Sequence, residues 1–172
     1  MKSDYYKRYI DVNTKRKADI SELFQNPKVF SNLISDMVAL FRGIKIDKVI
    51  GIDAYGFVLA APMALKLKKP LVLVRKEGKL PGLQKNIARV SIVDYKERKI
   101  MEVLRKSIKK GDRVLIVDEW IESGGQMKGV VKLLERLGAK IVGIGVINAD
   151  RKKCPRILLD KYNLQSLINK NL

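Results

Sequence analysis

The sequence predicts an α/β fold, with a mostly parallel, twisted sheet that helices cover on both faces. Three observations lead to this prediction. Short runs rich in valine, isoleucine and leucine alternate with segments whose apolar residues recur at helical spacing. Residues 113–147 have the order of a βαβ unit, with Gly138 as a helix stop. The chain of 172 residues is 47% hydrophobic, which suffices for one core around a sheet.

Length and composition also limit the organisation of the chain. We expect residues 1–172 to form a single domain, with residues 1–17 as an N-terminal arm and residues 150–172 as a C-terminal extension of the same domain. The one cysteine, Cys154, excludes an internal disulfide and fits the reducing cytoplasm. No window resembles a membrane span or a secretory leader, so we expect a cytoplasmic protein without a membrane partner.

Two features of the composition bear on chemistry. Histidine is absent, which excludes histidine-based zinc sites, Ser–His and Cys–His nucleophiles and imidazole acid–base catalysis. The formal net charge is +18, from 36 basic and 18 acidic residues. This excess is compatible with nucleic-acid binding, with attraction of a polyanionic small substrate, or with a lysine-rich source proteome. The lysines are spread along the whole chain, which favours the last two explanations.

The first predicted helix begins near Asn26 and Pro27, a capping residue followed by proline at the first helical position. We expect it to end at Gly43 and to bury an apolar stripe at helical spacing: Phe30, Leu33, Ile34, Met37, Val38 and Phe41. Residues 1–17, by contrast, are basic and rich in tyrosine and show no clear period.

The middle of the chain alternates strands and turns. Residues 48–52 form a short buried strand, a turn at residues 53–56 follows, and a helix runs through Leu67. Residues 70–74 are a second apolar, β-rich run. The following basic segment, residues 75–89, contains Gly78, Pro81 and Gly82 and leads to a strand at residues 90–95.

The second half of the chain contains the clearest pattern. Residues 97–108 are compatible with either a helix or a strand. After them we predict a strand at 113–117, a helix at 126–137 and a strand at 140–147. The basic tail after Asp150 has short apolar runs at residues 157–159 and 164–168.

Residues 114–126, VLIVDEWIESGGQ, are the most informative stretch of the sequence. A buried strand stops at the acidic pair Asp118 and Glu119, and the chain then turns through a hydroxyl and two glycines into a helix. The N–H groups of such a turn and helix N-terminus can hold a phosphate. Carboxylates at the strand's end can accept hydrogen bonds from sugar hydroxyls. The stretch therefore predicts a site for a sugar phosphate.

This motif resembles the signature of the type I phosphoribosyltransferases, which bind 5-phosphoribosyl 1-pyrophosphate (PRPP). The resemblance implies the type I phosphoribosyltransferase fold. It also implies that Asp118 and Glu119 take the ribose hydroxyls, and that five consecutive residues take the 5-phosphate: Glu122, Ser123, Gly124, Gly125 and Gln126.

Further segments resemble the adenine phosphoribosyltransferase family, over roughly residues 18–168. The segments are ADISELFQNPKVF at 18–30, GIDAYGF at 51–57 and RKEGKLPG at 75–82. The resemblance implies that five residues contact the pyrophosphate: Ala54, Tyr55, Arg75, Lys76 and Lys79. A pyrophosphate leaving group develops negative charge, so fixed cations near it lower the barrier.

Three residues are candidates for catalytic roles. Asp94 and Tyr95 resemble the Glu-Tyr pair of a lid that excludes water in this family. Glu122 stands where the adenine enzymes usually have alanine and where hypoxanthine-guanine phosphoribosyltransferases have an aspartate that faces purine N7. Glu122 is therefore a candidate for the general base or for the selector of a 6-oxopurine. A glutamate that faces solvent, whose backbone alone serves the loop, is the alternative.

The chain departs from the adenine enzymes at other positions. Tyr55 replaces an arginine that usually contacts pyrophosphate, and residues 13–17 replace the segment that shapes the adenine pocket. Trp120 stands where an aliphatic residue is commoner, either in the core or beside the base. The family resemblance therefore does not determine which base this protein uses.

The sequence thus predicts a purine phosphoribosyltransferase that uses PRPP and Mg²⁺ in purine salvage, with adenine as the first candidate base. Mg²⁺ is expected on the substrate's oxygens, near Asp118, without a direct protein ligand. The alternatives are a hypoxanthine or guanine enzyme, and a non-catalytic PRPP-binding regulator that contacts nucleic acid. An RNA- or nucleotide-binding accessory factor has only the net charge in its favour. Family resemblance implies a homodimer.

Overall fold

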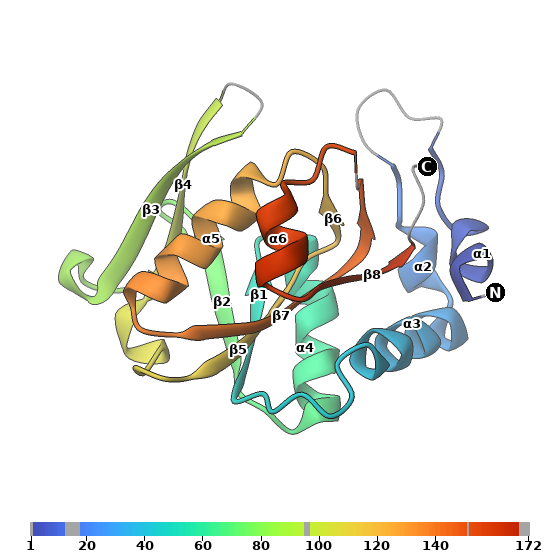
Figure 1. Ribbon diagram of the computed structural model, residues 1–172, viewed down its shortest axis with the longest axis horizontal. Coiled ribbons are helices and arrows are strands. Elements are labelled where there is room, and N and C mark those ends of the chain that lie inside the picture. Colours follow the sequence, from blue (N-terminus) through green and yellow to red (C-terminus); the bar gives the residue numbers. More distant parts are fainter. Residues whose placement is uncertain (1, 13–17, 95–96, 151, 169–172) are drawn as a thin grey trace.

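An eight-stranded sheet forms the centre of the computed structural model, which describes residues 2–12, 18–94, 97–150 and 152–168 (Figure 1). The strands follow one another in the order β3-β4-β2-β1-β5-β7-β6, and β8 also pairs with β7. Their bounds are β1 Lys48–Ile52, β2 Leu71–Lys76, β3 Ile87–Asp94, β4 Glu97–Leu104, β5 Arg113–Val117, β6 Trp120–Ile121, β7 Lys140–Ala149 and β8 Leu164–Ile168.

The sheet is mostly parallel, as the sequence predicts. The pairs of β1 with β2 and β5, and of β7 with β5, β6 and β8, are parallel. The antiparallel pairs are those of β4 with β2 and with β3. Residues 97–108, which the sequence left undecided, therefore begin as a strand. Met101 and Val103 on β4 are fully buried, and the antiparallel partner β3 supplies the pairing that a local pattern cannot indicate.

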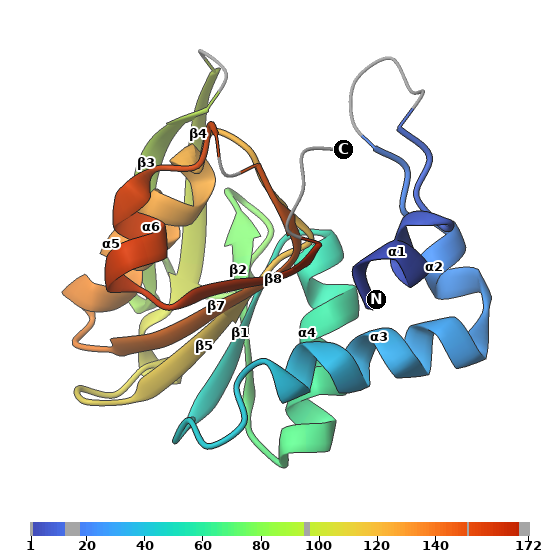
Figure 2. The same ribbon diagram turned by 45° about the vertical axis from the view of Figure 1, so that its right-hand side comes forward.

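Helices cover both faces of the sheet, which confirms that prediction (Figure 2). On one face, α5 contributes Val130 and Leu134 to a core that also contains β3 and β4 side chains. On the other, Met37 of α3 and Met63 of α4 belong to a second core. The helices are α1 Lys2–Lys7, α2 Glu22–Gln25, α3 Pro27–Ala39, α4 Tyr55–Leu67, α5 Gly125–Arg136 and α6 Arg156–Lys161, with short 3-10 turns at Gln84–Asn86 and Arg105–Ser107.

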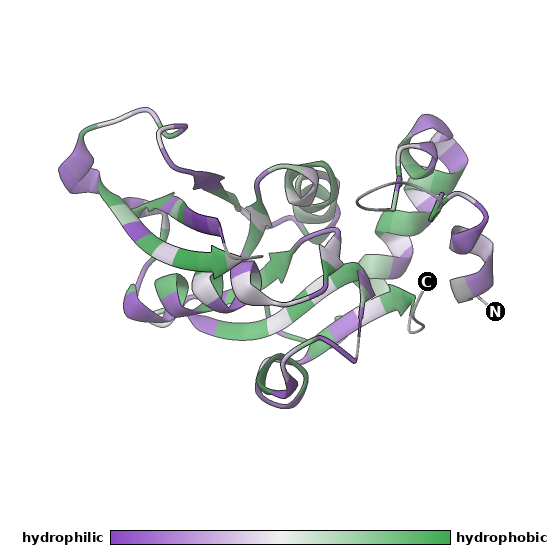
Figure 3. Ribbon diagram, turned by 90° about the horizontal axis from the view of Figure 1, so that it is seen from above, coloured by the Kyte–Doolittle hydropathy of each residue, from purple (hydrophilic) through white to green (hydrophobic). Residues whose placement is uncertain are grey.

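Hydropathy follows this layering. Green, hydrophobic residues run through the central strands, and purple, hydrophilic residues gather on outer turns and helix surfaces (Figure 3). No helix in the described ranges is both long and apolar enough to pass through a membrane.

Helix α3 begins where the sequence predicts it and ends earlier. The Asn26 side chain accepts hydrogen bonds from the N–H groups of Lys28 and Val29, at 3.0 and 3.2 Å, and Pro27 is the first helical residue. The helix ends at Ala39 rather than at Gly43, and Phe41 is buried beyond its end. The Phe41 ring lies against two positions of β7 that lack a side chain, Gly143 and Gly145.

The described parts of the N-terminal arm and of the C-terminal extension pack against the sheet and its helices. In the N-terminal arm, which the sequence left without a period, the short helix α1 buries Tyr6. Its hydroxyl donates a hydrogen bond to Asp36 Oδ2 of α3 over 2.7 Å. Burial and the neighbouring Asp36 carboxylate raise the pKa of Tyr6. In the C-terminal extension, residues 164–168 add β8 to the sheet, so the second apolar run of the tail is a strand.

Candidate active site

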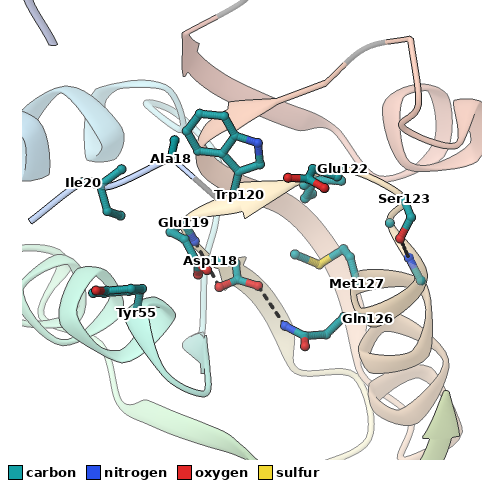
Figure 4. Close-up of a pocket in the computed structure, with 13 residues that line it drawn as sticks. Ala18, Ile20, Tyr55, Asp118, Glu119, Trp120, Glu122, Ser123, Gln126 and Met127 are labelled. Carbon is teal, nitrogen blue, oxygen red and sulfur yellow. Dashed lines mark hydrogen bonds between the residues drawn. The ribbon is translucent and has the colours of Figure 1, made fainter. Parts of the chain in front are cut away.

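A pocket of about 130 Å³ opens beyond the C-terminal end of β5 (Figure 4). Parallel α/β sheets bind ligands at this edge. Four parts of the chain meet there: the segment before α2, the start of α4, the turn after β5 and the first turn of α5. The lining residues are Ala18, Ile20, Tyr55, Asp118, Glu119, Trp120, Ile121, Glu122, Ser123, Gly124, Gly125, Gln126 and Met127. The predicted acidic pair and all five residues of the predicted phosphate loop thus line one pocket.

The turn between β5 and α5 presents main-chain N–H groups. Gly124 has φ +67° and precedes α5, which begins at Gly125. The N–H of Lys128 donates to Gly124 O over 2.9 Å, the first bond of the helical series. The N–H of Gly125 donates to Ser123 Oγ over 3.3 Å. It and the other N–H groups before Lys128 have no acceptor within the helix, because an α-helix leaves its first four donors without one. Together with the helix dipole they form a place for an anion.

The glycine at position 124 is required by two features. Its φ lies in the left-handed region, which side chains with a Cβ disfavour. A Cβ would also meet Pro155 Cδ at 2.6 Å and Leu158 Cδ1 at 3.1 Å. Residues of the C-terminal extension therefore pack directly against the turn and support its conformation.

Asp118 is a buried carboxylate, 4% exposed, at the end of β5. Its Oδ1 accepts from the N–H of Glu119 at 3.0 Å, and its Oδ2 accepts from Nε2 of Gln126 at 3.3 Å. Burial, followed by the neighbouring Glu119 carboxylate, raises the pKa of Asp118 well above the usual range. Glu119 is half-buried and also lines the pocket. Figure 4 shows the two acids side by side between Tyr55 and Gln126.

The start of α4 forms the opposite wall. Gly56 allows this helix to approach β5, because a Cβ there would meet Val117 O at 2.8 Å and Asp118 Oδ1 at 3.1 Å. The peptide bond between Asp53 and Ala54 is cis. Tyr55, which replaces the usual arginine, lines the pocket and stacks on Phe24 with ring centroids 5.9 Å apart. Ala54 is exposed and is not among the lining residues.

The three predicted pyrophosphate cations lie at the end of β2, which contains Arg75 and Lys76, and in the turn after it, which contains Lys79. None of them is among the lining residues of this pocket. Arg75 Nη1 donates to the carbonyl oxygen of Lys79 over 2.7 Å, and its Nε lies 3.8 Å from Asp53 Oδ2. The guanidinium carbon of Arg75 lies 6.0 Å from the centre of the Phe57 ring. The side chains of Lys76 and Lys79 are exposed. Arg75 thus joins this loop to the turn after β1.

The three catalytic candidates occupy two places. Glu122 is half-buried and lines the pocket, beside Trp120 in Figure 4. Asp94 is the last residue of β3 and pairs in register with Glu97 of β4. Tyr95 lies outside the described residues, as does the segment 13–17 that replaces the adenine-pocket motif. Within the described part of the chain, Glu122 is thus the catalytic candidate that lines the pocket.

Several lining residues were not candidates from the sequence. Ala18 and Ile20 flank Asp19, whose main chain forms an antiparallel bridge with Asp11. The only sequence signal for them was the ADI pattern at residues 18–20. Trp120, considered for either core or pocket, serves both: it packs on the α3–α4 core and lines the pocket. The short strand β6, which holds it, was not predicted.

Comparison with known proteins gives consistent results. The model of the phosphoribosyl transferase domain matches residues 19–171. The adenine phosphoribosyltransferase of Roseobacter denitrificans is 39% identical over 129 residues, covering 75% of this chain and 72% of that protein. The enzyme of the same name from Clostridium botulinum is 34% identical over 154 residues, covering 90% and 88%.

Solved structures are similar over almost the whole chain. The APRTase from Giardia lamblia, complexed with 9-deazaadenine, has a TM-score of 0.86 at 26% identity and covers 100% of this chain and 99% of that one. The adenine phosphoribosyltransferase from Thermoanaerobacter pseudethanolicus has a TM-score of 0.84 at 28% identity, covering 96% and 98%.

Proposed function

Since this chain belongs to the phosphoribosyl transferase domain family, we propose that it is a purine phosphoribosyltransferase. The reaction joins adenine and PRPP to give the nucleoside monophosphate and pyrophosphate, a step of purine salvage. The relatives named above are adenine phosphoribosyltransferases. Adenine is therefore the first candidate base.

The observation that carries this proposal is the pairing of acids and helix N-terminus in one pocket. Asp118 and Glu119 line it together with the turn at residues 122–126. A ribose 5-phosphate needs both kinds of group: acceptors for the 2- and 3-hydroxyls and N–H donors for the phosphate. Asp118 and Glu119 supply the acceptors. The N–H groups before Lys128 supply the donors, and that of Gly125 would exchange its bond to Ser123 Oγ for one to the phosphate. Ser123 and Gln126 can add side-chain donors to the phosphate.

The chemical step forms a bond from purine N9 to the anomeric carbon and breaks the bond from that carbon to pyrophosphate. The electron pair of the broken bond leaves with pyrophosphate. We assign the leaving group to the loops that carry Ala54, Tyr55, Arg75, Lys76 and Lys79. Glu122 accepts the proton from N7 of the base, and Asp94 and Tyr95 belong to a lid over the reacting centre.

Mg²⁺ is the cofactor that we propose for this reaction. In the described part of the chain no group of three or more acidic, cysteine or histidine residues could hold a metal ion. The ion would instead arrive with PRPP and be held mainly by the substrate's oxygens, near Asp118. When bound, Mg²⁺ neutralises charge on the diphosphate.

A panel of bases tests the proposal. Purified protein is incubated with PRPP, Mg²⁺ and one of adenine, hypoxanthine, guanine or uracil, and pyrophosphate release is followed. We expect release with adenine. Release with hypoxanthine or guanine alone would support the 6-oxopurine alternative, which the Glu122 carboxylate in the pocket favours. If PRPP binds but no base gives pyrophosphate release, the proposal that the protein is an enzyme is contradicted.

That last result would favour the alternative of a non-catalytic PRPP-binding regulator. The observation in its favour is Tyr55, an uncharged ring in the pocket where the family usually has an arginine. Filter binding of duplex DNA over a salt series tests the contact with nucleic acid. A steep salt slope without sequence preference would indicate only attraction by the net charge of +18.

We also propose a homodimer in the cytoplasm. Support for a second copy comes from large apolar side chains that α4 and β2 expose: Val58, Leu65, Leu71 and Leu73. Leu65, with 80% of its surface exposed, is the most accessible of them. Light scattering should give the mass of a dimer for the wild type and of a monomer for Leu65→Lys. The single cysteine, Cys154, is buried, and one cysteine cannot form a disulfide within the chain, which fits a reducing compartment.

A further inference from the structure

Glu102 is a buried carboxylate outside the pocket. It lies on β4, and only 1% of its side chain is exposed. Across the sheet it is in register with Arg75 of β2 on one side and with Arg89 of β3 on the other. Burial of a charged carboxylate is costly unless hydrogen bonds compensate it, so its partners indicate why it is there.

The two oxygens of Glu102 hold two different segments. Oε1 accepts from Nε of Arg89 over 2.6 Å, and Oε2 accepts from the main-chain N–H of Gly78 over 3.1 Å. Arg89 also donates to the side chain of Gln84. Glu102 therefore fixes the loop between β2 and β3 at Gly78 directly and at Gln84 through Arg89.

Gly78 is the third residue of a tight turn formed by residues 76–79. Its φ is +75°, and the N–H of Lys79 donates to Lys76 O over 3.3 Å. Such a turn brings the α-carbons of its first and last residues to within about 7 Å. Those two residues are Lys76 and Lys79, whose side chains are both exposed. The turn thus places two exposed lysines close together along the main chain.

A pair of adjacent cations suits a diphosphate, which carries charge on two phosphorus centres. We propose that Glu102 is a positioning residue for the pyrophosphate group of PRPP: it clamps the turn at residues 76–79 so that Lys76 and Lys79 are presented together. The inference rests on the proposed function. It assigns Glu102 no contact with substrate, because its carboxylate is buried and occupied by Arg89 and Gly78.

Two ligands separate this role from a general loss of structure. PRPP and ribose 5-phosphate share the sugar and its 5-phosphate, but only PRPP carries the diphosphate. Binding of each is measured by calorimetry with Mg²⁺. Glu102→Gln keeps the shape of the side chain and leaves a single acceptor oxygen, so either Gly78 or Arg89 loses its partner.

We expect Glu102→Gln to weaken PRPP binding by about tenfold and to change ribose 5-phosphate binding by less than about twofold. The matched control is Glu135→Gln on α5, where the carboxylate accepts from Tyr162 over 3.0 Å, away from the lining residues. It should leave both affinities unchanged. Unchanged PRPP binding in Glu102→Gln, or an equal loss for the two ligands, would overturn the role of Glu102. A wild-type chain that binds neither ligand would overturn the proposed function itself.

A second variant reaches the same turn without touching Glu102, in case Glu102→Gln does not fold. Gly78→Ala places a Cβ where no atom lies within 4 Å, so its effect comes from the left-handed φ alone. We expect the same selective loss of PRPP. Gly111→Ala, with φ +89° and equally open space, is its control. If PRPP binding is unchanged in both Glu102→Gln and Gly78→Ala, the proposed role of Glu102 is refuted.

Discussion

The side-chain amide of Gln126 donates a hydrogen bond to Asp118 Oδ2 over 3.3 Å, joining the first turn of α5 to the end of β5. The bond links the two halves of the proposed ribose 5-phosphate site, the acids and the helix N-terminus. It also partly satisfies a carboxylate that is almost completely buried. The stability of the protein should therefore depend on the ionisation of Asp118.

Asp118→Asn should stabilise the fold at neutral pH while it abolishes catalysis. Because the pKa of Asp118 is raised in the folded protein, the native state keeps a proton that the unfolded chain has lost. Its contribution to stability is therefore lost as pH rises from about 4 towards the raised pKa. Asparagine does not ionise, so the Tm difference between variant and wild type should grow over this window. Calorimetry across the pH range measures it, and a constant difference would contradict the prediction.

Gly124→Ala should weaken both the fold and phosphate binding. The new Cβ meets Pro155 Cδ at 2.6 Å and the residue keeps a left-handed φ, so we expect a loss of about 2–4 kcal/mol in the free energy of unfolding. Gly43→Ala is the control: its φ is +81° but its Cβ meets nothing within 4 Å, so about 1 kcal/mol is expected. Denaturant unfolding gives the two values, and calorimetry with ribose 5-phosphate gives the affinity. Equal losses of stability would show that Pro155 moves aside.

Glu122→Gln should lower turnover with adenine by about a hundredfold if the carboxylate is the general base. The amide is isosteric but cannot accept the N7 proton. Steady-state rates with adenine and with hypoxanthine measure the effect. A loss with hypoxanthine alone would make Glu122 a selector of the base. Unchanged rates with both bases would remove Glu122 from catalysis.

Asp47→Asn should lower Tm at neutral pH and matter less in acid. Arg113 holds Asp47 through Nε at 2.8 Å and Nη2 at 2.5 Å, and these bonds keep the pKa of Asp47 well below its usual range. The stabilisation is present above the ordinary pKa of about 3.9 and is lost as pH falls towards the lower native value. Thermal unfolding should show a smaller Tm difference between the variant and the wild type at about pH 3 than at pH 7. A Tm difference that is larger in acid would contradict the prediction.

Much of the fold was predictable from local patterns. The strand at 113–117 and the start of α3 at Pro27 lie at the predicted residues, and α5 begins one residue before its predicted start. In these cases the signal lies within one element: a run of β-branched residues, a capping side chain followed by proline, or glycines before a helical stripe. Because they are neighbours in the sequence, Asp118, Glu119 and the glycine turn could likewise be predicted to lie on one connection between a strand and a helix.

The surroundings of the site were decided by the tertiary structure alone. Pairing with β3 makes a strand of residues 97–104, and the fold brings Pro155 against Gly124 and Ile20 into the pocket. It also gives Glu102 its partners from two separate segments. Sequence by itself determined which residues each strand end and turn carries, because backbone propensity acts over a few neighbours. Which distant segments meet depends on sheet order and close packing, which no short stretch of the chain contains.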